Sequence, residues 1–239
     1  MSRRTWTPVF DRLVRRYDVL APDLPGCARS PALMGIPDVV AVADAVMAWL
    51  RAVGVERPHI AGNSFGGGVA IELWMRGAAR SVTALSPIGF WSSAEFTYAR
   101  LMIESAHALA GRYRSLIPLL VRNKPALAVF LAPFFAQGDK LDEEYITYAI
   151  EDLTGSSQTL FETLDATEEY RVRAHETKIP LTIAWGAEER LLIGQQYQRA
   201  RNTISGARHL LLPGCGHLCM ADDPALVTAT IDQTVGVTG

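Results

Sequence analysis

The stretch Ile60-Ala61-Gly62-Asn63-Ser64-Phe65-Gly66-Gly67-Gly68 decides the fold that this sequence predicts. An apolar strand end leads into it, and an amphipathic segment from Val69 to Met75 follows it. Residues 62–66 fit the pattern G-x-S-x-G, in which a serine stands at a strained strand-to-helix corner and exposes its hydroxyl at the edge of a sheet. Ser64 is therefore a candidate nucleophile, and a plain glycine-rich turn is the alternative interpretation.

The neighbours of Ser64 have expected roles of their own. We expect glycine at Gly62 and Gly66 because side chains there would collide with the neighbouring strand and helix. The amide N–H of Phe65 lies at the predicted start of a helix, where such groups point toward negative charge. Phe65 is therefore the candidate backbone donor for a charge that develops beside Ser64.

Size and composition indicate one mid-sized domain that can hold an inserted subdomain. The 239 residues are 49% hydrophobic and 20% charged, which favours a large core over disorder. A net charge of -2 gives no electrostatic reason to expect a nucleic acid or an anionic membrane as partner. We also expect a small-molecule substrate, no cofactor and no metal, and leave association into a homo-oligomer open.

Targeting and redox signals favour the cytoplasm. Residues 1–6 lack the apolar run of a signal peptide, and no later stretch is long enough to span a bilayer. Cys27, Cys215 and Cys219 are odd in number and do not have the spacing of a zinc site. We interpret them as reduced thiols of a cytoplasmic protein.

Short apolar runs alternate with helical patterns through the first part of the chain. A helix is predicted over residues 6–15, a strand over Tyr17–Ala21, and a second helix from an Asp38 cap to Val53. The strand that enters Ser64 follows, and the next strand covers Ser81–Leu85. This alternation predicts a mainly parallel α/β sheet flanked by helices.

The pattern changes between residues 89 and 178, where no convincing strand occurs. Helices are predicted there over residues 96–109, 115–121, 126–135 and 142–153. We interpret residues 89–178 as a helical cap, and residues 1–88 with 179–239 as the core that carries the sheet. Apolar side chains of the cap pack on their neighbours or line a substrate pocket. The candidate pocket residues are Asn63, Phe90, Trp91, Leu131 and Phe134.

The α/β alternation returns after the cap. Strands are predicted over residues 179–185 and 209–212, and helices over residues 194–204 and 224–231. A polar cluster directly follows each strand: Gly186-Ala187-Glu188-Glu189 and Gly214-Cys215-Gly216-His217. Because ligands of open parallel sheets gather beyond the carboxyl ends of the strands, both clusters are expected beside Ser64.

His217 is the histidine best placed to act as a base for Ser64. A serine hydroxyl is a poor nucleophile until a base takes its proton, and imidazole titrates near neutrality. Of the five histidines, only His217 lies on a glycine-rich loop after a strand. A carboxylate behind the imidazole would fix its tautomer and stabilise its charged form. Glu188 and Glu189 are the candidates, and a solvated surface pair is the alternative interpretation of these two residues.

Taken together, these residues resemble the α/β-hydrolase fold family in its capped, esterase-like branch. The resemblance implies a Ser64–Glu189–His217 triad, with the amide of Phe65 as oxyanion donor and a helical cap over the pocket. The family usually has aspartate at the position of Glu189, and some members accept glutamate. Glu188 is a second candidate acid, and Glu95 is a weaker one. Four stretches between about Trp6 and Val235 carry the resemblance: Val19-Leu-Ala-Pro-Asp-Leu-Pro-Gly26 with Ser30, Gly62-Asn-Ser-Phe-Gly-Gly67, Trp185-Gly-Ala-Glu-Glu-Arg-Leu-Leu192 and Leu212-Pro-Gly-Cys-Gly-His217.

The front of the chain departs from the family pattern, so we expect an N-terminally truncated form of the fold. Family members carry a strand ending in His-Gly before the segment that begins here at Trp6. The loop after that strand supplies a second oxyanion amide, and the strand lies between the one at Tyr17–Ala21 and the strand that enters Ser64. Three explanations stay open: a misassigned start, a sheet closed up by direct pairing of those two strands, or a decayed and poorly active member.

The resemblance implies a serine hydrolase that cleaves a small, apolar carboxylic ester or a related acyl compound. Serine at the elbow speaks against a haloalkane dehalogenase or an epoxide hydrolase, which resemble this family but have aspartate there. Hydrolysis of carbon–carbon bonds and cofactor-free haloperoxidase chemistry use the same triad and stay open. The alternative from another class is a catalytically impaired, ligand-binding protein that lacks the second oxyanion donor.

Overall fold

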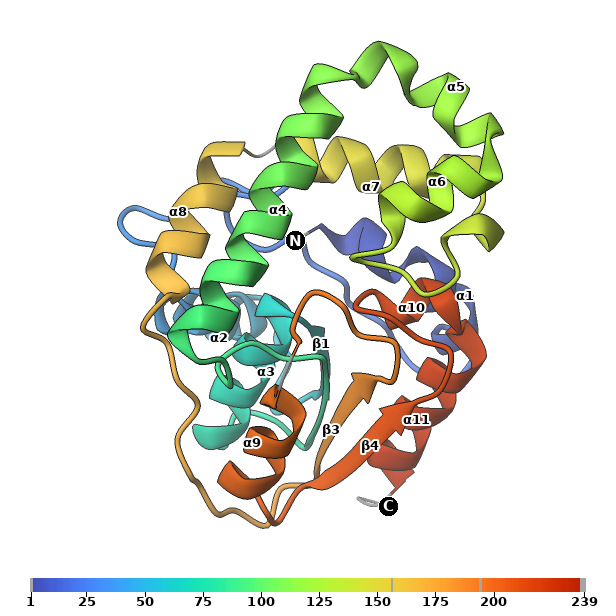
Figure 1. Cartoon of the computed structure of the whole chain (residues 1–239). Coiled ribbons are helices and arrows are strands. Elements are labelled where there is room, and N and C mark those ends of the chain that lie inside the picture. The colour runs from blue at the N-terminus through green and yellow to red at the C-terminus, as the bar shows by residue number, and fades with distance from the viewer. Residues whose placement is uncertain (1, 156, 194, 237–239) are drawn as a thin grey trace.

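The computed structural model describes residues 2–155, 157–193 and 195–236, and its centre is a parallel sheet (Figure 1). The strands are β1 (His59–Asn63), β2 (Ser81–Leu85), β3 (Leu181–Gly186) and β4 (Arg208–Leu212), in the spatial order β1-β2-β3-β4. All three neighbouring pairs are parallel. Every residue of β2 and β3 is buried, as expected for strands covered on both faces. The predicted parallel α/β fold is confirmed.

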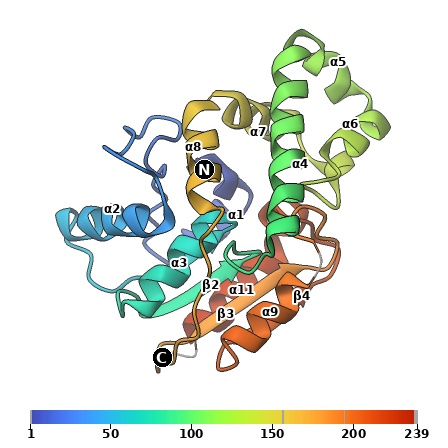
Figure 2. The same cartoon turned by 60° about the vertical axis from the view of Figure 1, so that its left-hand side comes forward.

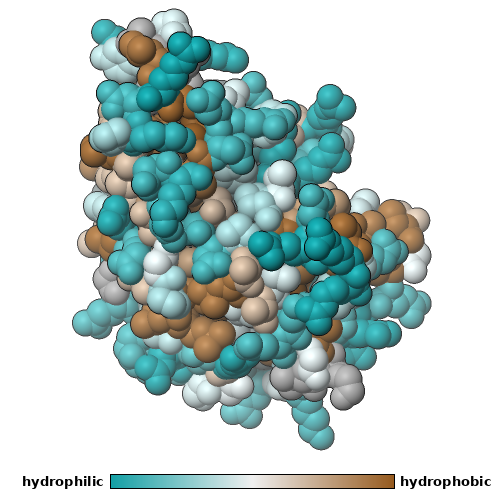
Figure 3. All heavy atoms as spheres, turned by 90° about the vertical axis from the view of Figure 1, so that its right-hand side faces the viewer, coloured by the Kyte–Doolittle hydropathy of each residue, from teal (hydrophilic) through white to brown (hydrophobic). Residues whose placement is uncertain are grey.

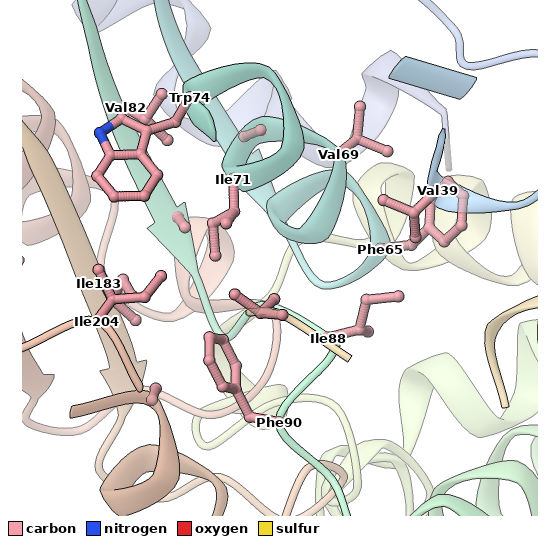
Figure 4. Packing of buried hydrophobic residues seen from close by; sticks show 14 of the residues in the cluster. Val39, Phe65, Val69, Ile71, Trp74, Val82, Ile88, Phe90, Ile183 and Ile204 are labelled. Atoms are coloured by element: carbon pink, nitrogen blue, oxygen red, sulfur yellow. The ribbon is translucent and has the colours of Figure 1, made fainter. Parts of the chain in front are cut away.

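Helices cover both faces of this sheet (Figure 2). The helices α2 (Val39–Ala52), α3 (Phe65–Met75) and α9 (Gln196–Thr203) contribute to one hydrophobic cluster with β2 and β3, part of which is drawn in Figure 4. On the other face, α1 (Thr7–Leu13), α10 (Cys219–Asp222) and α11 (Pro224–Gly236) pack against Leu85, Ala184 and Leu212. A short helix, η1 (Arg3–Trp6), precedes α1. Each strand therefore contributes side chains to a packed core.

The predicted cap of Asp38 is confirmed. Its side chain accepts a hydrogen bond from the amide of Ala41 at 2.7 Å and satisfies one of the free N–H groups at the start of α2. The predicted helices near both ends of the chain also form, within a few residues of their expected bounds. The capping and periodicity rules therefore located the helices that flank the sheet.

Between β2 and β3 the described residues form helices joined by irregular segments and no strand, and we call residues 89–178 the helical insertion. Its α-helices are α4 (Ser93–Arg112), α5 (Ile117–Arg122), α6 (Lys124–Leu131), α7 (Glu143–Gly155) and α8 (Ser157–Thr167). Short helices η2 (Arg114–Leu116) and η3 (Gly138–Lys140) lie between them. A separate cluster that includes Leu127, Leu131 and Ile146 packs inside the insertion. The division into core and cap stays a prediction.

The predicted strand over Tyr17–Ala21 is wrong. These residues are irregular, and the described part of the sheet has four strands rather than the five expected. The hydroxyl of Tyr17 donates to Asp232 on α11 at 2.6 Å, and Tyr17 and Val19 pack beside the cluster under α1 and α11. An apolar run forms a strand only where a partner strand satisfies its backbone groups, and this segment has none among the described residues. The closed-up sheet is therefore also wrong.

The surface mixes polar and apolar side chains on the face drawn in Figure 3, where brown hydrophobic atoms lie in patches between teal hydrophilic ones. Across the described residues, none of the helices combines the length and the hydropathy needed to cross a bilayer.

Candidate active site

Ser64 stands at the corner between β1 and α3. Its φ of 55° lies in the left-handed region, which is strained for a residue with a side chain. The amide of Ser64 donates to the carbonyl of Leu85 at 2.9 Å, and its carbonyl accepts from the amides of Gly68 and Ile88 at 3.0 and 3.1 Å. These bonds hold the strained corner that the G-x-S-x-G pattern predicts.

Of the two glycines that flank Ser64, only Gly62 occupies a position where any side chain would clash with its neighbours. A Cβ atom on Gly62 would lie 2.1 Å from the carbonyl oxygen of Gly66, which is far inside any normal contact. The same expectation for Gly66 is wrong, because a Cβ there would meet nothing within 4 Å. Gly66 lines an open cavity, whereas the crowded glycines of α3 are Gly67 and Gly68, packed against Pro87 and Ile88.

Phe65 begins α3, so its amide belongs to the first turn, whose N–H groups have no partner within the helix. The side chain of Phe65 is buried beside Val39 (Figure 4). Its amide directly follows Ser64 in the chain and lies at the corner between β1 and α3. The helix dipole adds a partial positive charge at the same end of α3. This environment favours a negative charge next to Ser64.

His217 forms a buried hydrogen bond with Glu189. The imidazole Nδ1 lies 2.9 Å from Glu189 Oε2, and both side chains are at most 5% exposed. The other oxygen, Oε1, accepts from the amides of Leu191 and Leu192 at 2.9 and 3.1 Å. Burial raises the pKa of Glu189, but the charge and hydrogen bond of His217 and the two amides outweigh burial and hold the pKa at about 2. Glu189 is therefore a carboxylate at neutral pH.

The two other candidate acids face elsewhere. Glu188 is exposed, and its backbone amide donates to the carbonyl of Cys215 at 2.9 Å. Glu95 caps α4 through Ser92 and also bonds Arg199 and the amide of Gln195. Of the three carboxylates, Glu189 is the one that the structure pairs with the imidazole of His217.

The remaining histidines have the structural surroundings expected from the sequence. His59 bonds Ser81 through Nδ1 at 2.8 Å, and His209 bonds the carbonyl of Ile204 through Nε2 at 2.9 Å. Burial lowers the pKa of both imidazoles. His107 packs edge-on against Phe161, and His175 packs edge-on against Trp74.

Asn63 connects the Ser64 corner to the His217 loop. Its carboxamide Nδ2 donates to the carbonyl of His217 at 3.0 Å and to the carbonyl of Leu85 at 3.1 Å. Asn63 is buried, so these bonds are shielded from water. The sequence predicted Asn63 as a pocket residue, and its main contact is with the backbone of the histidine loop.

Ser64 and His217 open into one cavity of about 910 Å³. The cavity runs along β1 from Asn63 to His59 and is lined on its other sides by α2, the Tyr17–Ala21 segment and the helical insertion. Asn63, Trp91, Leu131 and Phe134 line it, as predicted. Phe90 does not: its ring is buried against Trp185, with ring centroids 6.3 Å apart, in the core cluster of Figure 4. The expectation for Phe90 is therefore wrong.

Sequence reasoning missed several residues of this region. Helix α8 was not predicted, yet Leu160, Thr163 and Leu164 on it line the cavity. The amides of Leu191 and Leu192 were also missed, although a carboxylate that accepts from amides two and three residues later is a recurrent local pattern. Asp222, which accepts from the backbone amides of Ala136 and Gly216, was also missed.

A metal site has no support in the described part of the chain, where no group of three or more His, Cys, Asp or Glu side chains could hold an ion. The chemistry that the arrangement offers is that of a hydroxyl, an imidazole and a carboxylate beside a helix N-terminus.

Comparison with known proteins identifies the family of the chain. Residues 1–230 match the sequence profile of the family described as "Alpha/beta hydrolase family". An epoxide hydrolase, EphH, of Mycobacterium tuberculosis is 28% identical over 208 residues, which cover 81% of this chain and 93% of that protein. Among solved structures, a thermophilic esterase from Thermogutta terrifontis superposes with a TM-score of 0.71 at 18% identity, covering 100% of this chain and 86% of that one.

A second solved structure has a more elaborate substrate in its name. It is the 2-hydroxy-6-oxo-6-phenylhexa-2,4-dienoate hydrolase from Rhodococcus sp. strain RHA1, with a TM-score of 0.75 at 16% identity, covering 98% of this chain and 85% of that one. At these identities the two structures establish the fold alone. Because the family profile spans nearly the whole chain, this protein belongs to the alpha/beta hydrolase family and is by that membership a hydrolase.

Proposed function

We propose that this protein is a serine hydrolase that cleaves a small, apolar carboxylic ester or a related acyl compound through a Ser64–His217–Glu189 triad. The observations that carry the proposal are the 2.9 Å hydrogen bond between His217 Nδ1 and Glu189 Oε2 and a strained Ser64 that lines the same cavity as His217. With Nδ1 occupied by the carboxylate, Nε2 is the imidazole nitrogen left to accept a proton.

The reaction then proceeds in two acyl-transfer steps. Ser64 Oγ attacks the carbonyl carbon while His217 Nε2 takes the hydroxyl proton, and the amide of Phe65 donates to the developing oxyanion. Collapse of the tetrahedral intermediate breaks the bond to the alcohol, which leaves with the proton from His217. Water, deprotonated by His217, attacks the acyl-enzyme and restores Ser64. Glu189 stabilises the imidazolium in both steps.

The substrate class follows from the cavity and from the identity of the nucleophile. Most side chains that line the 910 Å³ cavity are apolar, which suits an apolar acyl or alcohol group. A relative named epoxide hydrolase makes epoxide opening a second candidate. Family members that open epoxides carry aspartate at the elbow, and this chain has Ser64, so we favour the acyl substrate.

The test is turnover of a panel of p-nitrophenyl esters, with styrene oxide as the epoxide member. We expect ester hydrolysis by the wild type, loss of it in Ser64→Ala, and wild-type turnover in the matched control Ser93→Ala, an exposed serine at the start of α4. Ester turnover that persists in Ser64→Ala would contradict the proposal. Epoxide opening without ester turnover would favour the second candidate, and binding of the esters without turnover would favour a non-catalytic protein.

A further inference from the structure

The loop that carries His217 is held by the helical insertion as well as by the core. The turn between α6 and η3, residues 134–137, lies directly against residues 214–218. We propose that Asp222 is a positioning residue that clamps this turn to the His217 loop, so that the placement of the insertion sets the placement of the imidazole. The inference rests on the proposed role of His217 as the base for Ser64.

Asp222 binds three backbone amides, which come from both sides of the contact. Its Oδ2 accepts from the amide of Gly216 at 2.7 Å and from the amide of Ala136 at 3.0 Å. Its Oδ1 accepts from the amide of Gln137 at 2.8 Å. Gly216 directly precedes His217, whereas Ala136 and Gln137 belong to the insertion. One carboxylate therefore bridges the two segments.

Further bonds fix the same two segments around His217. The amide of Leu218, the residue after His217, donates to the carbonyl of Phe134 at 2.8 Å. The side chain of Gln137 donates to the carbonyl of Gly214 at 3.0 Å. The segments approach so closely that a Cβ on Gly216 would lie 2.8 Å from the amide nitrogen of Ala136. Both neighbours of His217 in the chain are thus bonded to groups outside the loop.

A carboxylate is the side chain that this contact needs. An ionised Asp has two oxygens that only accept, so Asp222 can accept from all three N–H groups at once. In Asp222→Asn, one oxygen becomes an NH2 group that faces an N–H donor, and at least one amide loses its acceptor. An amide that loses its acceptor in this partly buried contact destabilises the contact, and a movement of the turn or of the loop would relieve it.

Asp222 and Gln137 act on the reaction through position alone. Neither residue lines the cavity that holds Ser64 and His217, so neither is in a place to touch a substrate there. On the core side, Asn63 holds the carbonyl of His217. If the insertion turn moved, it would displace one side of the His217 loop while Asn63 still held the carbonyl of His217, and the imidazole would change its position. Since a displacement of about 1 Å can cost roughly 100-fold in rate, kcat is the quantity that should respond.

The test compares Asp222→Asn with Asp223→Asn, the matched control, in hydrolysis of p-nitrophenyl butyrate and in the labelling rate of Ser64 by a fluorophosphonate. Asp223 is the adjacent acid, and its Oδ1 accepts from the amide of Leu226 in the first turn of α11. For Asp222→Asn we expect kcat and the labelling rate to fall by about 100-fold, with KM within about threefold of the wild type, at a temperature where thermal melting shows a folded protein. Asp223→Asn should keep the wild-type values.

Two results would overturn the inference. One is a wild-type kcat in Asp222→Asn with only a lower melting temperature, which is the signature of a purely structural contact. The other is an equal loss of kcat in both variants. If Asp222→Asn does not fold, Gln137→Ala takes its place, with an expected fall in kcat of about 10-fold and a wild-type kcat as the contradicting result. Absence of labelling and of turnover in the wild type would instead count against the proposed function.

Discussion

At the scale of single residues, the surroundings of Glu189 decide its protonation state and orient His217. The carboxylate is buried, yet its pKa is about 2, because one oxygen faces His217 and the other accepts from two amides. A carboxylate held in this way cannot turn to solvent without losing three hydrogen bonds. It can therefore keep the imidazole in the tautomer that leaves Nε2 free for Ser64.

Glu189→Gln should lower kcat of ester hydrolysis by about 1,000- to 10,000-fold, because the amide would favour the wrong imidazole tautomer and could not stabilise the imidazolium. Glu188→Gln is the matched control and should have a kcat within about twofold of the wild type, since Glu188 is exposed. Steady-state kinetics of both variants measure the difference. A wild-type kcat in Glu189→Gln together with a strongly lowered kcat in Glu188→Gln would show that Glu188 is the acid that orients His217.

The lowered pKa of Glu189 also predicts how stability depends on pH. The unfolded chain has the usual pKa of 4.5 at this residue and the folded protein has about 2, so between these values the unfolded state binds more protons. The stabilisation by Glu189 is complete above pH 4.5 and is lost as the pH falls toward 2. Urea unfolding at pH 7 and pH 3 should therefore show a larger loss of stability in the wild type than in Glu189→Gln. Equal losses in the two proteins would contradict this pKa.

At the scale of elements, the turn between β1 and α3 depends on one glycine more than on the other. Gly62→Ala should destabilise the protein by about 3 kcal/mol or more, because the new Cβ would lie 2.1 Å from a backbone oxygen. Gly66→Ala, the matched control, should change stability by less than about 1 kcal/mol, because its Cβ meets open space. Urea unfolding of both variants checks the pair, and equal destabilisation would contradict the packing at this corner.

The sequence predicted those elements whose local signals agree with their surroundings. The helix after Asp38 has both a cap and an apolar repeat, and the strands β2 and β3 are short apolar runs that end at turn residues. The run at Tyr17–Ala21 has the same local signal, but strand formation needs a partner that no local pattern reveals. Helix α8, residues 157–167, was missed although Leu160 and Leu164 on it have helical spacing.

The motif around Ser64 and the order of the strands were enough to predict which loops form the candidate site. The three polar loops were placed at one edge because parallel strands end there, and the structure brings Glu189 and His217 into contact. The direction of a side chain after a strand was beyond this reasoning. Phe90 follows Gly89, which has a φ of 100°, and its ring turns into the core rather than toward the cavity. The contacts of Asp222 depend on the fold of the insertion and could not be read from the chain.

At the scale of the whole molecule, one cavity joins the sheet edge, the helical insertion and the candidate triad. All five residues of β1 line this cavity, and β2 is the one strand that pairs with β1 among the described residues. The backbone groups on the open side of β1 therefore face the cavity. Figure 1 shows the insertion above this edge, with α4 and α8 on one side and α6 on the other.

The open edge predicts uneven protection of the sheet. Backbone amides of β1 should exchange with deuterium faster than those of β2 and β3, because half of a strand's hydrogen-bonding groups lack a partner strand on an open edge. Hydrogen–deuterium exchange measured by mass spectrometry resolves peptides that cover residues 59–63 and 81–85. Equal protection of the two strands would contradict an open edge at β1.

The central claim is that Ser64 is a nucleophile activated by His217, and covalent labelling with a fluorophosphonate tests it most directly. Intact-mass and peptide mass spectrometry should find one adduct in the folded wild type, on the peptide that contains Ser64, and labelling should be lost in Ser64→Ala and strongly slowed in His217→Ala. A folded wild type that stays unlabelled, or that carries the adduct on another serine, would contradict the account.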